Sequence, residues 1–376
     1  MEGMEIMADR LIRLAKSVIG DEEKKAVMGV LDREYLGMGN EVQIFEKELS
    51  SFFNRQAVCV NTGTAALHLA LQALGLGPGD EVLVQSLTYI ASFQAISATG
   101  ARPIPCDIDP DTITIDIHDA KKRLTKRTKA IMPVHYSGGV GSLDEIYSFA
   151  RENSLRVVED ACHAFGGNYK GRKVGSFGDI SCFSFDGIKN ITCGEGGAIV
   201  TDDEKVLKRA RDARLLGVEN DTERRYKGER SWDFDVKNQG WRYHMSNLMA
   251  AIGIEQLKKF PEFAKKRKYF AKKYYNNLNS SGSVDLLKQD FDSIVPHIFV
   301  VKLRSHDREK IRRSLLAQGI QTGVHYQPNH ELSMYQSSSL PITEKIFPEL
   351  LSLPLHPDLK DEDIDFVCEK LFDCTK

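Results

Sequence analysis

The sequence predicts an α/β protein with a mostly parallel β-sheet that helices cover on both faces. Short, almost wholly apolar runs recur along the first part of the chain, and segments with helical periodicity, such as 65–74 and 143–152, separate them. Such runs are typical of strands that are buried on both faces. Ligands of these folds bind where the strands end. The expected strands are AVCV (57–60), EVLVQ (81–85), AIMPVH (130–135), RVVED (156–160), SCFSF (181–185) and GGAIVTD (196–202).

The pattern changes beyond about Met245 into a long helical stretch with one apolar and one lysine-rich face, which Pro261 is expected to break or kink. The chain after it has the texture of a small α+β unit. For a chain of 376 residues, we expect a large domain over residues 1–250 and a small C-terminal domain over 251–376. The observations behind the second domain are the apolar helix face Phe263, Phe270, Tyr274 and Leu278, the run HIFVVKL (297–303), and helical patterns near 308–318 and 361–371.

Composition argues against several classes of partner. The 51 basic and 53 acidic residues leave a net charge of −2, so no global field favours nucleic acid or an anionic membrane. The basic runs at 121–129 and 265–268 are better explained as solvated helix faces. The N-terminus does not resemble a secretory signal, and no run approaches the roughly 20 apolar residues of a membrane span, so we expect a cytoplasmic protein. The seven cysteines form no CxxC pair, and we expect no metal site.

The residues with the clearest chemical meaning lie in the segment 157–203. Asp160 closes one expected strand, a second strand runs into Ser184, and Lys189 follows in a loop before the glycine-flanked stretch CGEGGAIV. If the two strands are parallel, their carboxyl ends face the same crevice. A carboxylate for a protonated pyridine nitrogen and a lysine for an aldehyde are what pyridoxal 5′-phosphate (PLP) requires. Taken alone, Asp160 is more often a helix cap and Lys189 a solvated surface group.

A second segment has the features of a phosphate site. In NTGTAALHLAL (61–71), small residues lead directly into a helix, where free backbone N–H groups can hold a phosphate. A plain N-cap at Thr62 or Thr64 is the simpler interpretation, and both interpretations can hold together.

The segment 157–203 resembles the signature of the DegT/DnrJ/EryC1/StrS family, the sugar aminotransferases among the fold-type I PLP enzymes. The shared features are a strand end EDxxHA or EDxxQA, a YKG turn, and a strand that leads to SFxxxKNxTxGEGG. The similarity continues in the same order from FEKEL, which ends at Leu49, to SLPLHPDL at 352–359. It therefore covers nearly the whole chain and implies the fold-type I architecture.

The resemblance also implies roles for individual residues. Lys189 corresponds to the lysine that forms the Schiff base and moves the proton, Asp160 to the partner of the pyridinium nitrogen, and His163 to the residue at the ring's 3-oxygen. A core histidine is the simpler interpretation of His163. Cofactor-binding positions are implied at Gly63, Thr64, Ala65, Tyr89, Ser184 and, across a dimer interface, Arg242.

Two further segments match the family, but one departs from it at a single residue and the other has an alternative structural interpretation. NQGWRYHMS (238–246) has Arg242 where the family usually has asparagine, and a permanently charged guanidinium suits a partner subunit's cofactor phosphate. In the segment 320–330, His325 and Tyr326 match residues that approach the sugar, and a structural His–Tyr pair is an equal alternative.

The function that the resemblance implies is transfer of the amino group of L-glutamate to a nucleotide-linked keto-sugar, most often a 4-keto-6-deoxyhexose, in a homodimer. L-Glutamate would leave as 2-oxoglutarate, and the product would enter polysaccharide or glycoconjugate synthesis. A non-sugar aminotransferase and a non-catalytic PLP-binding regulatory protein remain alternatives. Lys189 excludes the dehydratase branch, which has histidine there. A nicotinamide oxidoreductase is disfavoured because GLGPGD (75–80) lacks the GxGxxG spacing.

Overall fold

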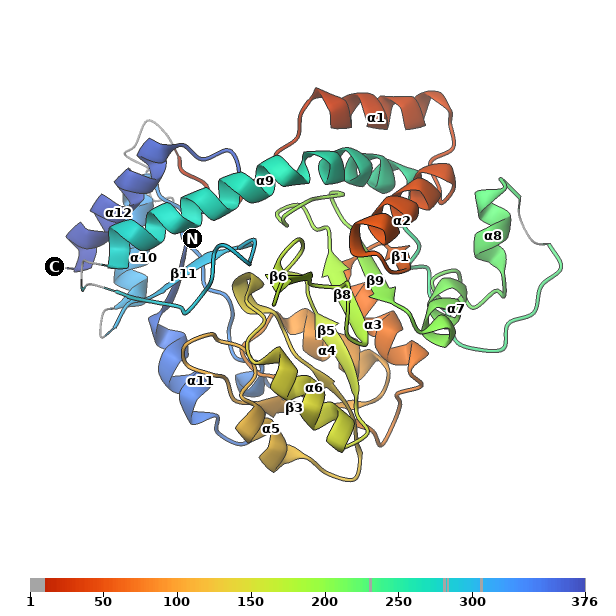
Figure 1. Cartoon of the computed structure of the whole chain (residues 1–376), viewed down its shortest axis with the longest axis horizontal. Helices are drawn as coiled ribbons and strands as arrows, with labels where there is room; N and C mark the ends of the chain where they lie inside the picture. Colours follow the sequence, from red (N-terminus) through yellow and green to blue (C-terminus); the bar gives the residue numbers. More distant parts are fainter. Residues whose placement is uncertain (1–10, 230–231, 280–281, 283, 305–306, 376) are drawn as a thin grey trace.

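A seven-stranded sheet forms the centre of the computed structural model, which describes residues 11–229, 232–279, 282, 284–304 and 307–375 (Figure 1). Its strand order is β1-β9-β8-β5-β4-β2-β3. Only β9 runs antiparallel to its neighbours, so the predicted mostly parallel α/β sheet is confirmed. The strands are β1 (Ala57–Val60), β2 (Glu81–Gln85), β3 (Arg102–Cys106), β4 (Thr128–Met132), β5 (Arg156–Asp160), β8 (Ile180–Ser184) and β9 (Gly197–Thr201).

Alternate residues of each strand enter two separate hydrophobic cores. In β1, Ala57 and Cys59 join one core, and Val58 and Val60 join the other. The period of two in a strand produces this division, and both faces are apolar because helices cover both (Figure 1). Helices α2 (Asn40–Phe53), α5 (Ile117–Arg123), α6 (Leu143–Glu152) and α9 (Asn247–Asn279) cover the first face, and α3 (Gly63–Ala73), α4 (Ile90–Ala98) and α7 (Glu204–Ala213) cover the second.

The strand β3 was not expected from the sequence. Its segment RPIPC contains Pro103 and Pro105, which cannot donate to a ladder of hydrogen bonds. The structure places β3 at the edge of the sheet, where its single neighbour is β2. Proline is tolerated at an edge because one side of the strand needs no partner.

The C-terminal part builds a second, three-stranded antiparallel sheet of β10 (Asp285–Leu286), β11 (Phe299–Lys302) and β12 (Leu350–Leu353). Helix α9 connects the two sheets and continues through Pro261, so the helix does not break there and the alternative, a kink, stays a prediction. Phe260 and Phe263 are buried on either side of Pro261, and this packing holds the helix together. Residue 250 lies inside α9, and the division into domains 1–250 and 251–376 stays a prediction. The second core also contains α10 (Arg308–Ala317) and α12 (Asp361–Thr375).

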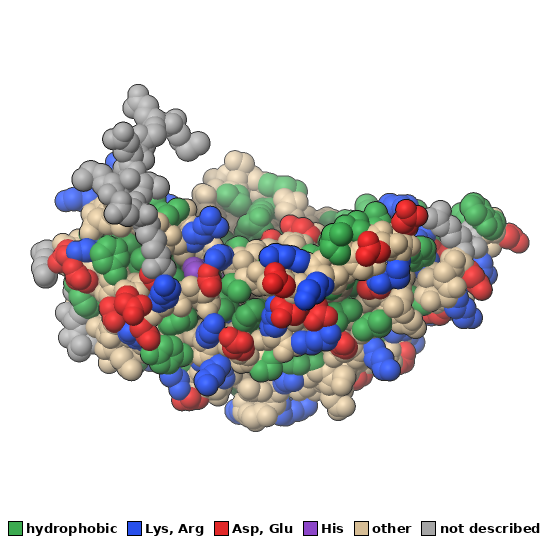
Figure 2. Space-filling view, turned by 90° about the horizontal axis from the view of Figure 1, so that it is seen from above, with side chains coloured by type: hydrophobic (Ala, Val, Ile, Leu, Met, Phe, Trp, Pro, Cys, Tyr) green, Lys and Arg blue, Asp and Glu red, His purple; other side chains and the backbone are tan. Residues whose placement is uncertain are grey.

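The remaining elements lie outside the two sheets described above. Helix α1 (Asp21–Asp32) runs along α9, and both signs of charge are interspersed over this face (Figure 2). None of the helices in the described residues combines the length and apolar character that a membrane crossing needs. The other elements are β6 (Asn168–Tyr169), β7 (Arg172–Lys173), α8 (Asp221–Tyr226), α11 (Pro341–Ile346) and the 3₁₀ turns η1 (Tyr136–Gly138), η2 (Asn329–Glu331) and η3 (Phe347–Glu349).

A buried ion pair joins α2, β1 and the end of α7. Arg214 Nη1 donates to Glu46 Oε1 at 2.5 Å and to the Cys59 carbonyl at 2.6 Å. Glu46 also accepts hydrogen bonds from the Cys59 N–H at 2.8 Å and from the Tyr226 hydroxyl at 2.5 Å. Each charge in this group is therefore satisfied by the others, and removal of one leaves the rest uncompensated.

We expect Arg214→Met to lower the free energy of unfolding by about 3–5 kcal/mol, because Glu46 would remain buried without its cation. Denaturant unfolding followed by circular dichroism measures this change. The matched control is Arg304→Met, because Arg304 pairs with Asp285 at the surface, with side chains 50% and 48% exposed. The control should lose less than about 1 kcal/mol. Equal losses in the two variants would contradict the buried-pair explanation.

Candidate active site

The candidate site lies where the parallel strands end. Asp160 is the last residue of β5 and Ser184 the last of β8, and these strands pair in parallel with Asp160 opposite Cys182. Helix α3 begins at Gly63, three residues after β1 ends, and Tyr89 precedes α4 after β2. The carboxyl ends of neighbouring parallel strands meet at one edge, which gathers the predicted residues there as expected.

The carboxylate of Asp160 is buried and held by two donors. Ser92 on α4 donates to Oδ2 at 2.7 Å, and the Cys162 N–H approaches Oδ1 at 3.3 Å. No helix begins at Asp160, so the helix-cap interpretation is wrong. The fixed orientation suits the predicted contact with a protonated ring nitrogen, since an ionised carboxylate stabilises that proton. Ser92 was missed because a serine inside a helical pattern carries no distinguishing signal.

The amine of Lys189 contacts a histidine that carries no sequence motif. Lys189 Nζ lies 3.4 Å from Nε2 of His297, which is 3% exposed. Burial lowers the pKa of Lys189, and burial together with the nearby Lys189 charge holds the pKa of His297 well below its usual range. A neutral lysine is the reactive form toward an aldehyde. His297 was missed because it opens the run HIFVVKL, whose pattern indicates a strand of the small C-terminal domain.

Two further predicted residues join this group. His163 Nε2 lies 3.0 Å from the Tyr326 hydroxyl, and the rings of His163 and His297 are 4.5 Å apart between centroids. Tyr326 also lies 5.3 Å from the ring of Tyr89. The segment with Tyr326 therefore reaches from the C-terminal part into the site at the ends of the large sheet.

His325 lies between the small sheet and the candidate site. Its Nδ1 hydrogen bonds with Ser352 Oγ on β12 at 2.7 Å, and its carbonyl accepts from the Tyr136 hydroxyl. Burial, and then the charge of Lys189, lowers the pKa of His325 to about 4. The side chain is thus anchored in the small sheet and still close enough to Lys189 to respond to its charge.

The start of α3 has the geometry of a phosphate cradle. Thr62 caps the helix by accepting the Ala65 N–H at 3.0 Å, so the N-cap interpretation is confirmed. A Cβ at Gly63 would lie 2.7 Å from Ser184 Cβ, and only glycine allows the helix to approach β8 so closely. The N–H groups of Gly63 and Thr64 have no i−4 acceptor within the helix. They fit a phosphate together with the Ser184 hydroxyl.

Arg242 stands apart from this group within the single chain. Its side chain is exposed, and its backbone bridges to Leu215. The neighbouring Tyr243 carbonyl accepts the Asn61 N–H at 2.7 Å, so the segment runs beside the strand that leads into α3. The predicted contact of Arg242 with a partner's phosphate stays a prediction.

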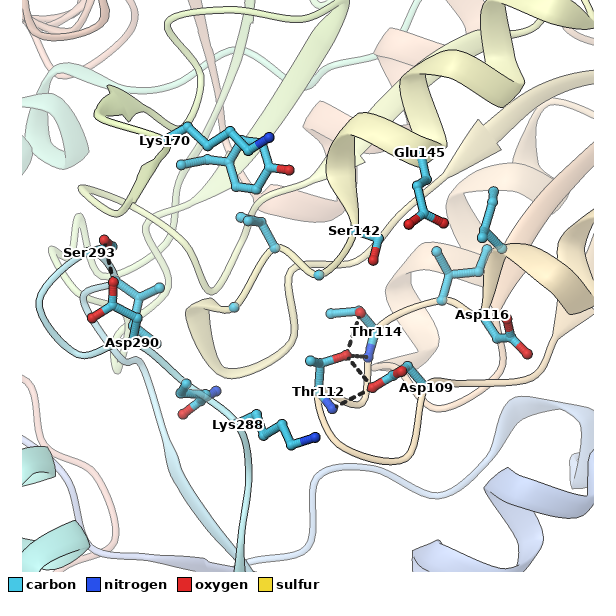
Figure 3. A pocket seen from close by; sticks show the side chains of 18 of the residues that line it. Asp109, Thr112, Thr114, Asp116, Ser142, Glu145, Lys170, Lys288, Asp290 and Ser293 are labelled. Carbon is cyan, nitrogen blue, oxygen red and sulfur yellow. Dashed lines mark hydrogen bonds between the residues drawn. The ribbon is translucent and has the colours of Figure 1, made fainter.

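A separate hollow of about 550 Å³ opens beyond the ends of β3 and β4 (Figure 3). Asp109, Thr112 and Thr114 form one wall and are hydrogen bonded to one another. Lys170 and Lys288 face this hollow, but they pair with Asp144 and Asp111 respectively. Both ion pairs are exposed, and the hollow lacks a buried amine comparable to Lys189. The chemistry therefore belongs to the strand-end site.

Comparisons with known proteins agree with this geometry. A family model described as the DegT/DnrJ/EryC1/StrS aminotransferase family matches residues 17–372. GDP-perosamine synthase of Escherichia coli O157:H7 is 37% identical over 354 residues, 93% of this chain and 94% of that protein. The dTDP-4-dehydro-2,3,6-trideoxy-D-glucose 4-aminotransferase of Saccharopolyspora spinosa is 33% identical over 368 residues, 96% of each.

A solved structure of NtdA from Bacillus subtilis with the bound cofactor PMP, the amine form of PLP, has a TM-score of 0.86 and 31% identity. The match covers 100% of this chain and 87% of that one. These likenesses confirm the fold-type I architecture, and they show that the cofactor is PLP.

We expect the His325 imidazole of the cofactor-free protein to titrate near pH 4 instead of near the usual 6.5. Because the folded pKa is depressed, the stabilisation is full above pH 6.5 and is lost as the pH falls from 6.5 toward 4. An NMR titration, with the His325 signal assigned by its absence in His325→Asn, measures the midpoint. The variant should also show a shallower loss of unfolding free energy in this window. A midpoint near 6.5 would refute the buried environment described for His325.

Proposed function

This chain belongs to the DegT/DnrJ/EryC1/StrS aminotransferase family, and from this premise we propose that it transfers the amino group of L-glutamate to a nucleotide-linked 4-keto-6-deoxyhexose. It is a PLP-dependent sugar aminotransferase. The observation that carries the proposal is the arrangement at the strand ends, where Lys189 and Asp160 lie beside the cradle at Gly63 and Ser184. We further propose a cytoplasmic location and a product that enters polysaccharide or glycoconjugate synthesis.

The name of one relative supports amination at the fourth ring carbon, because it is a 4-aminotransferase of a dTDP-linked 4-dehydro sugar. A second relative is a GDP-perosamine synthase. The two names give different nucleotides, so they do not indicate one nucleotide for this chain. Nucleotide choice depends on a few pocket contacts that differ among related enzymes.

The residues of the site fit the cofactor group by group. Gly63, Thr64 and Ser184 would hold its phosphate, Asp160 its ring nitrogen, His163 its ring oxygen, and Tyr89 the face of its ring. When bound, PLP supplies an aldehyde that takes up the amino group and a ring that delocalises electrons from the substrate carbon. Asp160 keeps a proton on the ring nitrogen, and Ser92 keeps Asp160 in place.

Lys189 has two tasks in the proposed reaction. Its Nζ would anchor the cofactor between turnovers. When displaced, Nζ would take the proton from Cα of glutamate and deliver it to the carbon on the other side of the transferred nitrogen. Both tasks need an unprotonated amine, which burial favours by lowering the pKa of Lys189. His297 Nε2, at 3.4 Å, can accept a hydrogen bond from that amine and hold it in place.

Tyr326 and His325 are the proposed contacts with the sugar. Tyr326 reaches between His163 and Tyr89, where a sugar bound to the cofactor has to lie. L-Glutamate leaves as 2-oxoglutarate before the keto-sugar enters, so one site serves both substrates in turn.

The visible spectrum tests the proposed reaction. The PLP-loaded protein should absorb violet light, lose that band when L-glutamate is added, and regain it with the correct keto-sugar nucleotide. A panel of dTDP-, UDP- and GDP-linked 3- and 4-keto-sugars, with products identified by mass, defines the acceptor. Lys189→Ala should lose turnover by at least about 10⁴-fold with an unchanged circular dichroism spectrum. If glutamate bleaches the band and only free keto acids restore it, the sugar proposal is wrong and a non-sugar aminotransferase remains.

We also propose that the working unit is a homodimer with shared sites. Trp232, Phe234 and Val236 form an exposed apolar strip after α8, with exposed fractions of 86%, 58% and 46%. Hydrophobic side chains are visible at this end of the molecule, which also carries α8 (Figure 2). Apolar strips of this kind mark interaction sites, and Arg242 follows on the same segment. A second copy that covers the strip would bring Arg242 near its own cofactor phosphate.

We expect the double variant Trp232→Ala, Phe234→Ala to raise the dimer dissociation constant by at least about tenfold, since buried aromatic side chains dominate interface energies. Analytical ultracentrifugation over a concentration series measures this constant. Met334→Ala, another exposed apolar residue at 68% exposure, is the control and should change it less than twofold. Arg242→Ala should weaken PLP retention without dissociating the dimer. A fully active monomer would exclude shared sites.

A further inference from the structure

The hollow beyond the ends of β3 and β4 is large enough for a ligand and is separate from the strand-end site. Its volume of about 550 Å³ lies within the range of pockets that hold small molecules. Gly139 and Ile294 line it on two segments that also serve the candidate active site. The first segment carries Tyr136, which donates to the His325 carbonyl, and the second carries His297, whose ring contacts the reactive lysine.

The side chains around the hollow carry more negative than positive charge. Four carboxylates and two lysines line it, and both lysines already form ion pairs with other acids. The carboxylates belong to Asp109, Asp116, Glu145 and Asp290. This balance disfavours a phosphate or a nucleotide, and it favours a ligand that donates hydrogen bonds and carries a positive charge.

Glu145 is the carboxylate that is most available to a ligand. It lies on α6, and its side chain points into the hollow (Figure 3). It forms no ion pair or side-chain hydrogen bond with another described residue. By contrast, Asp109 accepts a hydrogen bond from the Thr112 hydroxyl at 2.9 Å. Asp290 accepts one from the Ser293 hydroxyl at 2.6 Å. An unpaired carboxylate in a cavity wall is a strong acceptor for a charged amine.

Gln289 adds a hydrogen-bond donor to the same wall. Its Nε2 is buried and has no partner among the described residues. The side chain lines the hollow, and a Cβ built on Gly139 would lie 3.7 Å from Nε2. A buried polar atom without a partner is unfavourable, and a ligand hydroxyl in the hollow would accept its hydrogen bond.

The rest of the lining fits a sugar ring better than a metal ion. Among the described residues, no group of three or more His, Cys, Asp or Glu is placed to hold a metal. The hydroxyls of Thr112 and Thr114 line the hollow, and buried Ile115, Val140 and Ile294 give it apolar surface. A sugar has hydroxyls for the polar groups and C–H faces for the apolar ones, which is the mixture that ligand pockets provide.

We propose that this hollow binds an amino sugar that carries no phosphate. The protonated amine would pair with Glu145, hydroxyls of the sugar would bind Gln289 and the two threonines, and the ring would pack on the apolar side chains. This site goes beyond the proposed function, because none of its residues takes part in transamination. Its ligand class follows from the lining alone, so the site and the proposed reaction can fail independently.

Ligand-observed NMR titrations of the PLP-loaded protein test the site with D-glucosamine, D-glucose and glucose 6-phosphate. At about pH 6.5 the amine of glucosamine is protonated. We expect glucosamine to bind at least about tenfold more tightly than glucose, which is the gain from one charge-assisted hydrogen bond. Glucose 6-phosphate should bind more weakly than either. No saturable binding of glucosamine up to about 10 mM overturns the proposal.

Two substitutions test the assigned contacts. Glu145→Gln should reduce the preference for glucosamine over glucose to less than about threefold, because the amide carries no charge. The matched control is Glu152→Gln on the same helix, since Glu152 is exposed and does not line the hollow. The control should keep the full preference. Gln289→Leu should raise the Kd of both sugars by at least about tenfold. A full preference in Glu145→Gln contradicts the amine contact.

Other ligands and a failure to fold give distinguishable outcomes. If putrescine, an amine without hydroxyls, binds as tightly as glucosamine, the sugar assignment is wrong. If Gln289→Leu weakens UDP-glucosamine more than glucosamine, the hollow belongs to a nucleotide and the proposal is wrong. If Gln289→Leu does not fold, Ser142→Trp decides, because Ser142 is exposed at the hollow and a bulky side chain there fills it. Lost glucosamine binding then supports the site, and unchanged binding overturns it.

The proposed reaction is checked separately. A protein that binds glucosamine in the hollow and aminates no keto-sugar nucleotide would refute only the proposed function. A protein that aminates a keto-sugar nucleotide and binds no glucosamine would refute only the amino-sugar site.

Discussion

The candidate site depends on the parallel pairing of β5 with β8. The register sets Asp160 opposite Cys182, so the loops that follow the two strands begin at the same edge of the sheet. The loop after β8 then carries Lys189 back over Asp160, and the close approach at Gly63 brings the start of α3 against Ser184. A slip of the register by one residue would turn the Asp160 side chain to the other face of the sheet, because neighbouring strand residues point to opposite faces.

The C-terminal part contributes to the site through hydrogen bonds to the loop before α4. Asn329 is fully buried and donates from Nδ2 to the carbonyls of Ser86 at 2.9 Å and Thr88 at 2.8 Å. The next residue along, His330, shares a hydrogen bond with the Ser86 hydroxyl at 2.7 Å. Tyr89 follows in the same loop, so the segment with Tyr326 also positions the ring that faces it. Movement of one side of the site therefore requires movement of the other.

The sequence predicts the parts of this arrangement that arise from local pattern. Apolar runs located six strands of the large sheet within a few residues, and the motif around Lys189 located the strand-end residues. The edge strand β3 escaped because Pro103 and Pro105 contradict the usual strand composition, and only its edge position permits them. His297 escaped for another reason. It lies just before β11, in a run whose pattern indicates packing, and only the tertiary fold shows that its ring contacts Lys189.

The electrostatics of the site are best understood through the difference between titratable and permanent cations. Burial disfavours the charged form of Lys189, His163 and His297, so these groups can exchange protons and accept hydrogen bonds without mutual repulsion. The guanidinium of Arg267 keeps its charge in the same surroundings because its pKa, even lowered to about 10, stays above neutrality. A lysine in place of Arg267 would lose its proton more readily when buried, so the two residue types are not equivalent at this position.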